Sequence, residues 1–243
     1  MVESPLGGEQ AFLGSCPLFA GLDDCQLAEV LARGVVQQVA RKEWFFREGE
    51  PAQALWVLRS GRGKLTKLFP DGQQVILRVL APGDMFGGVM ALGDHLYPAT
   101  AEALTASSAM AWVRGSLEEL FSTLPRLARN ALSLLAERMA EMQERYRELA
   151  TERVTQRVAR ALVRLVRQAG RRVDEGVLID LPLSREDLAA MSGTTLFTVS
   201  RILSEWESRG LVTTGRQRVL VRFPHGLVSI AEDLDAPGGE EGR

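Results

Sequence analysis

The sequence contains few of the residues from which catalytic and metal-binding sites are usually built. Its 243 residues include two histidines, His95 and His225, and two cysteines, Cys16 and Cys25. No nucleophile and base stand together in a known motif, and neither a GxGxxG nor a GxxxxGKS/T phosphate-binding loop occurs. We therefore expect no enzyme. An iron–sulfur cluster is not expected either, because it needs about four thiolate ligands and one chain supplies only two; a cluster shared between the two chains of a dimer is the alternative.

Long apolar runs are absent as well. No segment approaches the ~20 residues that a membrane-spanning helix requires. The first residues, MVESPLGGEQ, have neither the basic start nor the apolar middle of a signal peptide. The two cysteines form no disulfide framework, which fits a reducing compartment. We therefore expect a cytoplasmic protein without a membrane partner.

The net charge of the whole chain is only −2, but it is unevenly distributed. Residues 1–150 carry 15 basic and 18 acidic side chains. Residues 151–222 carry 13 arginines against 8 acidic side chains, a net charge of +5. A basic segment in an otherwise acidic protein favours a polyanion as the partner.

Regularly spaced glycines divide residues 15–120 into short strands. Gly49, Gly61, Gly72 and Gly83 follow one another at intervals of 12, 11 and 11 residues. Between them lie the apolar or alternating runs LWVLRS, GKLTKLF and QVILRVL. Short strands at this spacing predict an antiparallel sandwich, roll or small barrel. We expect an α+β protein whose N-terminal domain, residues 15–120, is a jelly-roll-like β-roll.

Residues 121–150 change to a helical period. Their apolar side chains recur at alternating spacings of four and three residues, as in the a/d seam of a coiled coil. The other faces carry charged side chains that suit solvent, Glu148 among them. A narrow seam favours packing against an identical helix in a homodimer, and packing on the chain's own domain is the alternative. The expected seam residues are Leu132, Leu135, Met139, Met142, Tyr146 and Leu149.

Residues 151–226 are expected to form a third domain, and residues 227–243 a tail with a disordered end. An arginine-rich helix comes first and ends at Gly170, a glycine C-cap. A loop then leads to LSREDLAAMSGTTLFTVSRILSEWESRGLV.

This last stretch predicts two helices joined by a tight turn. Ser184 and Asp187 form a capping box at the start of the first helix. Gly193 supplies the positive φ that ends this helix, and Thr194 or Thr195 caps the second. The following LVTTGRQRVLVRF predicts a β-hairpin around Gly215. Together these elements make a winged helix-turn-helix.

A winged helix-turn-helix places its second helix in the major groove of double-stranded DNA. Helix N-termini and arginines then bind phosphates. The expected base contacts are Thr195, Leu196, Phe197, Ser200 and Arg201. The expected phosphate contacts are Ser184, Arg185, Thr194, Thr198, Arg216 and Arg218. The alternatives are a helix-turn-helix that only packs inside the protein, and an effector-binding scaffold without DNA binding.

With these motifs, residues 15–230 resemble the Crp–Fnr family of bacterial transcription regulators. The stretch REGEPAQALWVLRSGRGKLTKLFPDGQQVILRVLAPGDMFGG resembles the family's cyclic-nucleotide-binding-type β-roll, and TTLFTVSRIL resembles its recognition helix. The resemblance implies a homodimer on a palindromic operator. It implies that a signal in the β-roll reorients the DNA-binding domains, which then recruit RNA polymerase, as in an activator, or block it.

Carried over by position, Arg201 matches the arginine with which the family reads guanine. Ser200 matches a base-contacting serine of oxygen-responsive members. Leu196 and Phe197 depart from the family, where many members have a polar or basic residue followed by a glutamate. The glutamate–cytosine contact is therefore missing, and apolar contact with a thymine methyl group is the physical substitute.

The sensor positions also depart from the family. Cyclic-nucleotide-binding members have a glutamate for the ribose and an arginine–serine pair for the phosphate, where this chain has Gly88, Pro98 and Ala99. No cation stands nearby in the sequence, and a buried phosphate without one is costly to desolvate. Cyclic AMP is therefore not the expected effector. The expected effector pocket comprises Gly87, Gly88, Met90, His95, Pro98, Ala99 and Thr100.

The effector itself stays open at this point. An unidentified small apolar or anionic molecule and no ligand at all are both compatible with the sequence. Haem is a third alternative, with His95 as an axial ligand and Met85 or Met90 as the second. Apart from that possible haem ligand, no metal site is expected. A thiol-redox role for Cys16 or Cys25 is a further alternative.

Overall fold

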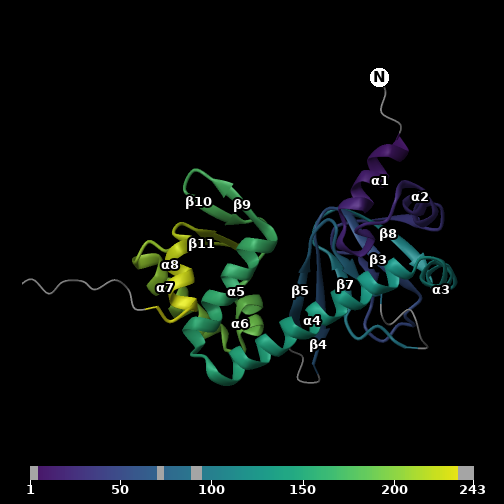
Figure 1. The fold of residues 1–243 in the computed structure, drawn as a ribbon. Coiled ribbons are helices and arrows are strands. Elements are labelled where there is room, and N and C mark those ends of the chain that lie inside the picture. Colours follow the sequence, from purple (N-terminus) through teal and green to yellow (C-terminus); the bar gives the residue numbers. More distant parts are fainter. Residues whose placement is uncertain (1–4, 70–73, 89–94, 235–243) are drawn as a thin grey trace, which may run out of the picture. The chain divides into compact units, whose positions relative to one another are not determined.

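The computed structural model describes residues 5–69, 74–88 and 95–234. The chain divides into two compact units, one of residues 1–67 and 80–143 and the other of residues 68–79 and 144–243. Within the described part, no helix is both long and apolar enough to cross a membrane. Figure 1 shows the strands of the β-roll in blue to teal and the C-terminal helices and strands in green to yellow.

Two four-stranded sheets form the β-roll, and all the strand pairings described in them are antiparallel. The first has the strand order β1 (Val35–Val39), β8 (Ser107–Val113), β3 (Ala54–Ser60), β6 (Met85–Phe86). The second has the order β2 (Trp44–Phe46), β7 (Thr100–Ala103), β4 (Gly63–Leu68), β5 (Gln74–Leu80). The expected α+β fold with an N-terminal antiparallel roll is confirmed.

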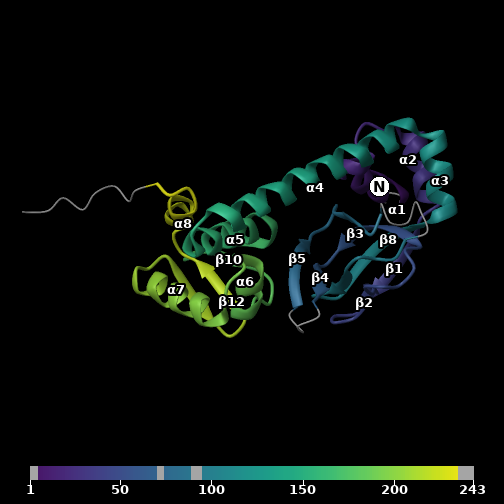
Figure 2. The same cartoon turned by 90° about the horizontal axis from the view of Figure 1, so that it is seen from below.

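Helices cover the outer face of the first sheet. They are α1 (Pro5–Ser15), the short 3-10 helix η1 (Pro17–Phe19), α2 (Asp24–Ala32) and α3 (Arg114–Thr123). Figure 2 shows α1, α2 and α3 beside the sheet that contains β3 and β8. Leu13 of α1 is fully buried in this layer, and the indole of Trp112 donates to the carbonyl oxygen of Val30 at 2.8 Å. The folded unit therefore begins before residue 15, within α1.

The long helix α4 (Pro125–Thr151) follows. It begins at Pro125, whose fixed φ and missing N–H suit the first turn of a helix. Its first turns are anchored in the N-terminal unit, because Leu127 is buried there and the amide of Asn130 donates to the carbonyl oxygens of Leu18 and Ala20.

The second unit contains α5 (Val154–Ala169), α6 (Arg185–Ser192), α7 (Leu196–Ser208) and α8 (Pro224–Ala231). It also contains a four-stranded sheet of order β11 (Val212–Gly215), β12 (Arg218–Val221), β10 (Gly176–Ile179), β9 (Gly170–Val173). The predicted helix-turn-helix is α6 and α7, and the predicted wing is β11 and β12.

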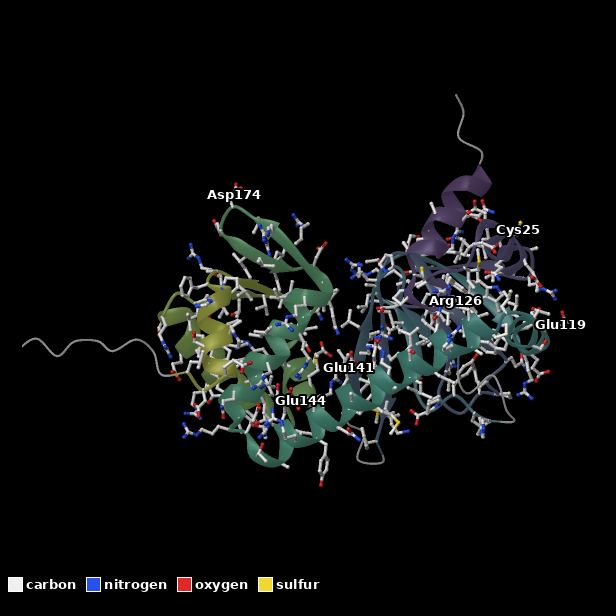
Figure 3. The ribbon with its side chains drawn as sticks, in the orientation of Figure 1. Cys25, Glu119, Arg126, Glu141, Glu144 and Asp174 are labelled. Carbon is white, nitrogen blue, oxygen red and sulfur yellow. The ribbon has the colours of Figure 1, made fainter. Side chains whose placement is uncertain are left out.

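The expected loop between α5 and α6 is wrong in part, because residues 170–179 form the hairpin β9–β10. Figure 3 shows Asp174 at the tip of this hairpin. Gly170 also differs from a usual left-handed C-cap, since its φ is −77°. Glycine is needed there because a Cβ atom would lie 2.2 Å from the carbonyl oxygen of Val166.

Helix α8 lies across the domain boundary expected at residue 226. Pro224 begins it, and Leu227 and Ala231 are buried. The helix packs on α5. The first residues of the expected tail are therefore part of the folded second unit.

Candidate nucleic-acid interface

The turn between α6 and α7 is built as the sequence predicts. The Ser184 hydroxyl accepts from the backbone N–H of Asp187 at 3.0 Å, and the Asp187 carboxylate accepts from the backbone N–H of Ser184 at 2.9 Å. Gly193 adopts the left-handed region, with φ 59° and ψ 49°, and ends α6. Thr195, rather than Thr194, caps α7, because its hydroxyl accepts from the backbone N–H of Thr198.

Helix α7 has one buried face and one exposed face. The buried side chains are Val199, Ile202, Leu203 and Trp206, as the periodicity predicts. At about 3.6 residues per turn, Phe197 lies diametrically opposite Trp206, and Arg201 lies one turn after Phe197 on the same side. Both are exposed, Leu196 is marginally so, and Ser200 is half-buried. The outer face of α7 therefore presents Phe197 and Arg201 to solvent.

The expected phosphate contacts lie around this face. Arg185, in the first turn of α6, is exposed and donates to the hydroxyl of Thr214 on β11 at 3.3 Å. Arg216 lies in the turn of the wing and Arg218 is the first residue of β12. In the described part of the chain, the guanidinium groups of Arg201, Arg216 and Arg218 have no hydrogen-bond or ion-pair partner. Their charge is available to a polyanion.

The arginines of α5 have a different role, which sequence reasoning did not identify. Arg157 donates to the carbonyl oxygens of Ser192 at 2.8 Å and Gly193 at 3.2 Å, so it holds the turn between α6 and α7. Arg160 pairs with Glu152 at 2.9 Å and with Glu232, the C-cap residue of α8, at 3.2 Å. Part of the positive charge of residues 151–222 is therefore neutralised within the fold, and the unpaired arginines include Arg201 on α7 and Arg216 and Arg218 on the wing.

Another ion pair of this unit concerns Glu148. The sequence placed Glu148 on a solvent-facing side of the helix, and the structure corrects this, because the side chain is buried. Its carboxylate accepts from Arg164 of α5 at 2.8 Å, which compensates the buried charge. One turn earlier, a hydrogen bond from Arg147 lowers the pKa of the Glu144 carboxyl group.

The expected dimer seam is an exposed apolar stripe on α4. Its six side chains range from 36% exposed at Leu135 to 76% at Tyr146. Leu149 also approaches the turn of the helix-turn-helix, since a Cβ atom on Gly193 would lie 2.6 Å from its Cδ2. The described part of the chain leaves the remaining seam side chains largely uncovered.

Aromatic rings fill the interior of the β-roll where an effector pocket is expected. Phe46 stacks on Tyr97 with ring centroids 3.7 Å apart. The Tyr97 hydroxyl donates to the carbonyl oxygen of Ala54 at 3.0 Å and accepts from the indole of Trp56 at 3.4 Å. Gly87 has φ 71°, and a Cβ atom on it would lie 3.0 to 3.2 Å from the rings of Phe46, Trp56 and Tyr97. These rings leave little room beside Gly87.

The structure adds one cation that sequence proximity did not indicate. Lys67 of β4 donates to the carbonyl oxygen of Pro98 at 3.0 Å, so an ammonium group does lie beside the expected pocket. The same group pairs with Glu48 at 2.9 Å. Thr100 accepts from the backbone N–H of Glu48, while Ala99 is buried. The local charge is therefore balanced within the protein.

Two of the three candidate haem ligands, His95 and Met85, lie in the described part of the chain. His95 is exposed, and its carbonyl oxygen accepts from the backbone N–H of Ala52 at 2.9 Å. Met85 packs with the helices outside the first sheet rather than in the roll interior. Met90 lies outside the described residues. Among the residues that are described, no three His, Cys, Asp or Glu side chains form a cluster fit for a metal ion.

The two cysteines differ in their surroundings. Cys25 is exposed and Cys16 is buried, and both are free thiols. Burial raises the pKa of the Cys16 thiol to about 11, with a smaller contribution from the charge of Asp84. Since the thiolate is the reactive form, Cys16 is a poor nucleophile at neutral pH.

Known proteins match both units. The family "Cyclic nucleotide-binding domain" matches residues 36–123, and "Crp-like helix-turn-helix domain" matches residues 156–230. The chain is 32% identical to the Cyclic AMP receptor protein of Thermus thermophilus, over 90% of this chain and 98% of that protein. It is 25% identical to the Transcriptional activator protein FnrA of Stutzerimonas stutzeri, over 90% and 89%.

A solved structure shows the same similarity in three dimensions. The crystal structure of a CRP-family transcriptional regulator from Thermus thermophilus superposes with a TM-score of 0.68 and 30% identity, covering 81% of this chain and 96% of that one. The winged helix-turn-helix, the antiparallel roll and these matches agree. The chain therefore belongs to the Crp–Fnr family of DNA-binding transcription regulators.

Proposed function

We propose that the protein binds a palindromic operator as a homodimer and regulates transcription by recruiting RNA polymerase or by blocking it. The observation that carries this proposal is the outer face of α7, with the unpaired guanidinium groups of Arg201, Arg216 and Arg218 around it. Arginines with no partner in the fold are suited to guanine and to phosphate. The bidentate contact of one arginine with guanine is worth about 1–3 kcal/mol of discrimination.

The exposed stripe on α4 supports the homodimer. Six apolar side chains in an a/d pattern are costly to leave in water, and an identical helix offers the same stripe to cover them. A twofold dimer presents two α7 helices related by symmetry, so the matching operator is a palindrome.

The signal is proposed to be something other than a cyclic nucleotide. A relative carries the name Cyclic AMP receptor protein, but the interior beside Gly87 is occupied by Phe46, Trp56 and Tyr97. Gly88, Pro98 and Ala99 carry no side-chain donor for a phosphate, and the charge of Lys67 is already compensated. A smaller apolar or anionic effector, or none, agrees better with this interior.

The test combines selection and titration with the full chain. Duplexes retained from a random library should converge on a palindrome, and their affinity should fall steeply between low and moderate salt because bound arginines displace counterions. Cyclic AMP should leave both the melting temperature and the operator affinity unchanged. Retention without convergence, or a palindrome bound by a monomer, would contradict the dimeric operator, and stabilisation by cyclic AMP would contradict the proposed sensor.

The haem alternative stays a prediction with its own test. Haem added to the protein should keep the absorption spectrum of free haem if His95 is only a surface residue. A shifted Soret band that disappears in His95→Ala would identify His95 as an axial ligand instead.

A further inference from the structure

Phe197 has the highest exposed fraction among the large apolar side chains of the described residues, 83%. It occupies the first turn of α7, on the side of the helix that points directly away from Val199 and Trp206. The side chain is therefore not a misplaced core residue. Its exposure at this place leaves the side chain free to contact a partner outside the folded chain.

The partner is set by the neighbouring arginine. Phe197 and Arg201 are four residues apart, about 6 Å along the axis of α7. Stacked base pairs are about 3.4 Å apart. If Arg201 reads a guanine, as the proposed function holds, Phe197 meets a base within about two base pairs of that guanine.

The side chains in the first turn of α7 then indicate which group of the base they contact. Leu196 and Phe197 have only carbon atoms in their side chains, so they cannot distinguish a carbonyl acceptor from an amino donor. The hydroxyls of Thr195 and Thr198 lie 3.0 Å apart and close the cap of the helix. The one apolar group that a base pair offers in the major groove is the C5-methyl group of thymine.

We propose that Phe197, with Leu196 beside it, reads a C5-methyl group in the major groove. The protein then accepts 5-methylcytosine as well as thymine at the base pair that Phe197 contacts. The inference rests on the proposed operator binding and specifies what the same site recognises. Thymine and 5-methylcytosine carry the same methyl group and differ at C4, which carbon side chains do not read. An operator with cytosine at this step is therefore strengthened by cytosine methylation.

The experiment uses the selected operator and the full chain. The Arg201→Ala variant first identifies the guanine, as the base that this variant no longer distinguishes. Within two base pairs of that guanine, each pyrimidine is then replaced in turn by thymine, uracil, 5-methylcytosine and cytosine. At one of these positions, thymine should bind about fourfold more tightly than uracil in each half-site, the effect of one buried methyl group. The ratio of the affinity for 5-methylcytosine to the affinity for cytosine should be the same.

Variants separate Phe197 from other causes of methyl preference. Phe197→Ala should reduce both ratios towards one, and its exposed position means that folding is unaffected. Phe223→Ala is the matched control, because this phenylalanine is 56% exposed in the same unit but lies before α8, at the far end of β12 from the turn of the wing. It should preserve both ratios.

The outcomes distinguish this inference from the proposed function. If no operator can be selected, the proposed function fails. If an operator is selected but thymine and uracil bind equally at every position tested, the methyl readout is overturned while operator binding stands. A preference for thymine over uracil without a preference for 5-methylcytosine over cytosine would also overturn the methyl readout. The protein would then not accept 5-methylcytosine in place of thymine.

Discussion

Arg164 places its Nη1 atom 2.8 Å from each carboxylate oxygen of Glu148, and this ion pair joins the last turns of α4 to α5 within one unit. Glu148 is only 6% exposed. A buried carboxylate is stable when a cation compensates it, and the removal of that cation leaves an uncompensated charge. The pair therefore fixes how α5 continues from α4.

We expect Arg164→Ala to destabilise the second unit by about 2–3 kcal/mol, below the 3–5 kcal/mol typical of a fully buried pair because Arg164 is partly exposed. The measurement is the urea midpoint of the full chain. Arg167→Ala is the control, since Arg167 is exposed on the same helix, and it should stay within about 0.5 kcal/mol of the parent. Equal effects of the two substitutions would mean that the pair with Glu148 contributes nothing.

The second prediction concerns the dimer seam on α4. Leu135→Glu together with Met142→Glu should convert the homodimer to a monomer, because a dimer would bury charges without partners. Sedimentation velocity measures the change, and operator affinity should fall with it. Glu137→Gln together with Glu141→Gln, off the seam, should remain dimeric. If the variant with both seam substitutions remains dimeric, dimerisation must use another surface.

The features that the sequence predicted depend on local signals. The capping box of Ser184 and Asp187, the positive φ of Gly193 and the buried face of α7 each follow from residues within one or two turns. The antiparallel roll follows from turn glycines, since Gly49, Gly61 and Gly83 all have positive φ. Such signals act whatever the rest of the chain does.

The features that the sequence did not predict depend on distant residues. The hairpin β9–β10 is too short to be stable alone, and it forms because Val177 pairs with Val221 of the wing. Glu148 cannot be told from other glutamates on the same helix until α5 brings Arg164 beside it. Lys67 reaches Pro98 because β4 pairs with β7. No local pattern marks these contacts.

The third prediction concerns how the reactivity of the Cys16 thiol and its contribution to stability depend on pH. Burial raises the pKa of its thiol from 9.0 to about 11, so at pH 8 its thiolate fraction is lower than that of an ordinary thiol by roughly a hundredfold. Iodoacetamide should therefore modify Cys25 and spare Cys16, as mass spectrometry of the peptides will show. Because the folded pKa is the higher one, the thiol favours the folded state below pH 9, and this contribution is lost between pH 9 and pH 11. Rapid labelling of Cys16 in the folded protein at pH 8 would reopen a redox role.

The fourth prediction concerns Arg201, on which the assignment of the operator face depends. Arg201→Ala should lose about 1–3 kcal/mol of discrimination at one guanine in each half-site, while the dimer and its nonspecific DNA binding persist. Competition between the operator and duplexes substituted at that guanine measures the loss. Arg209→Ala is the control, because Arg209 is the C-cap residue of α7, about two turns after Arg201, and pairs with Glu205 at 3.5 Å. Unchanged discrimination in Arg201→Ala would mean that a different face of α7 enters the groove, and Phe197 would then no longer lie beside the guanine.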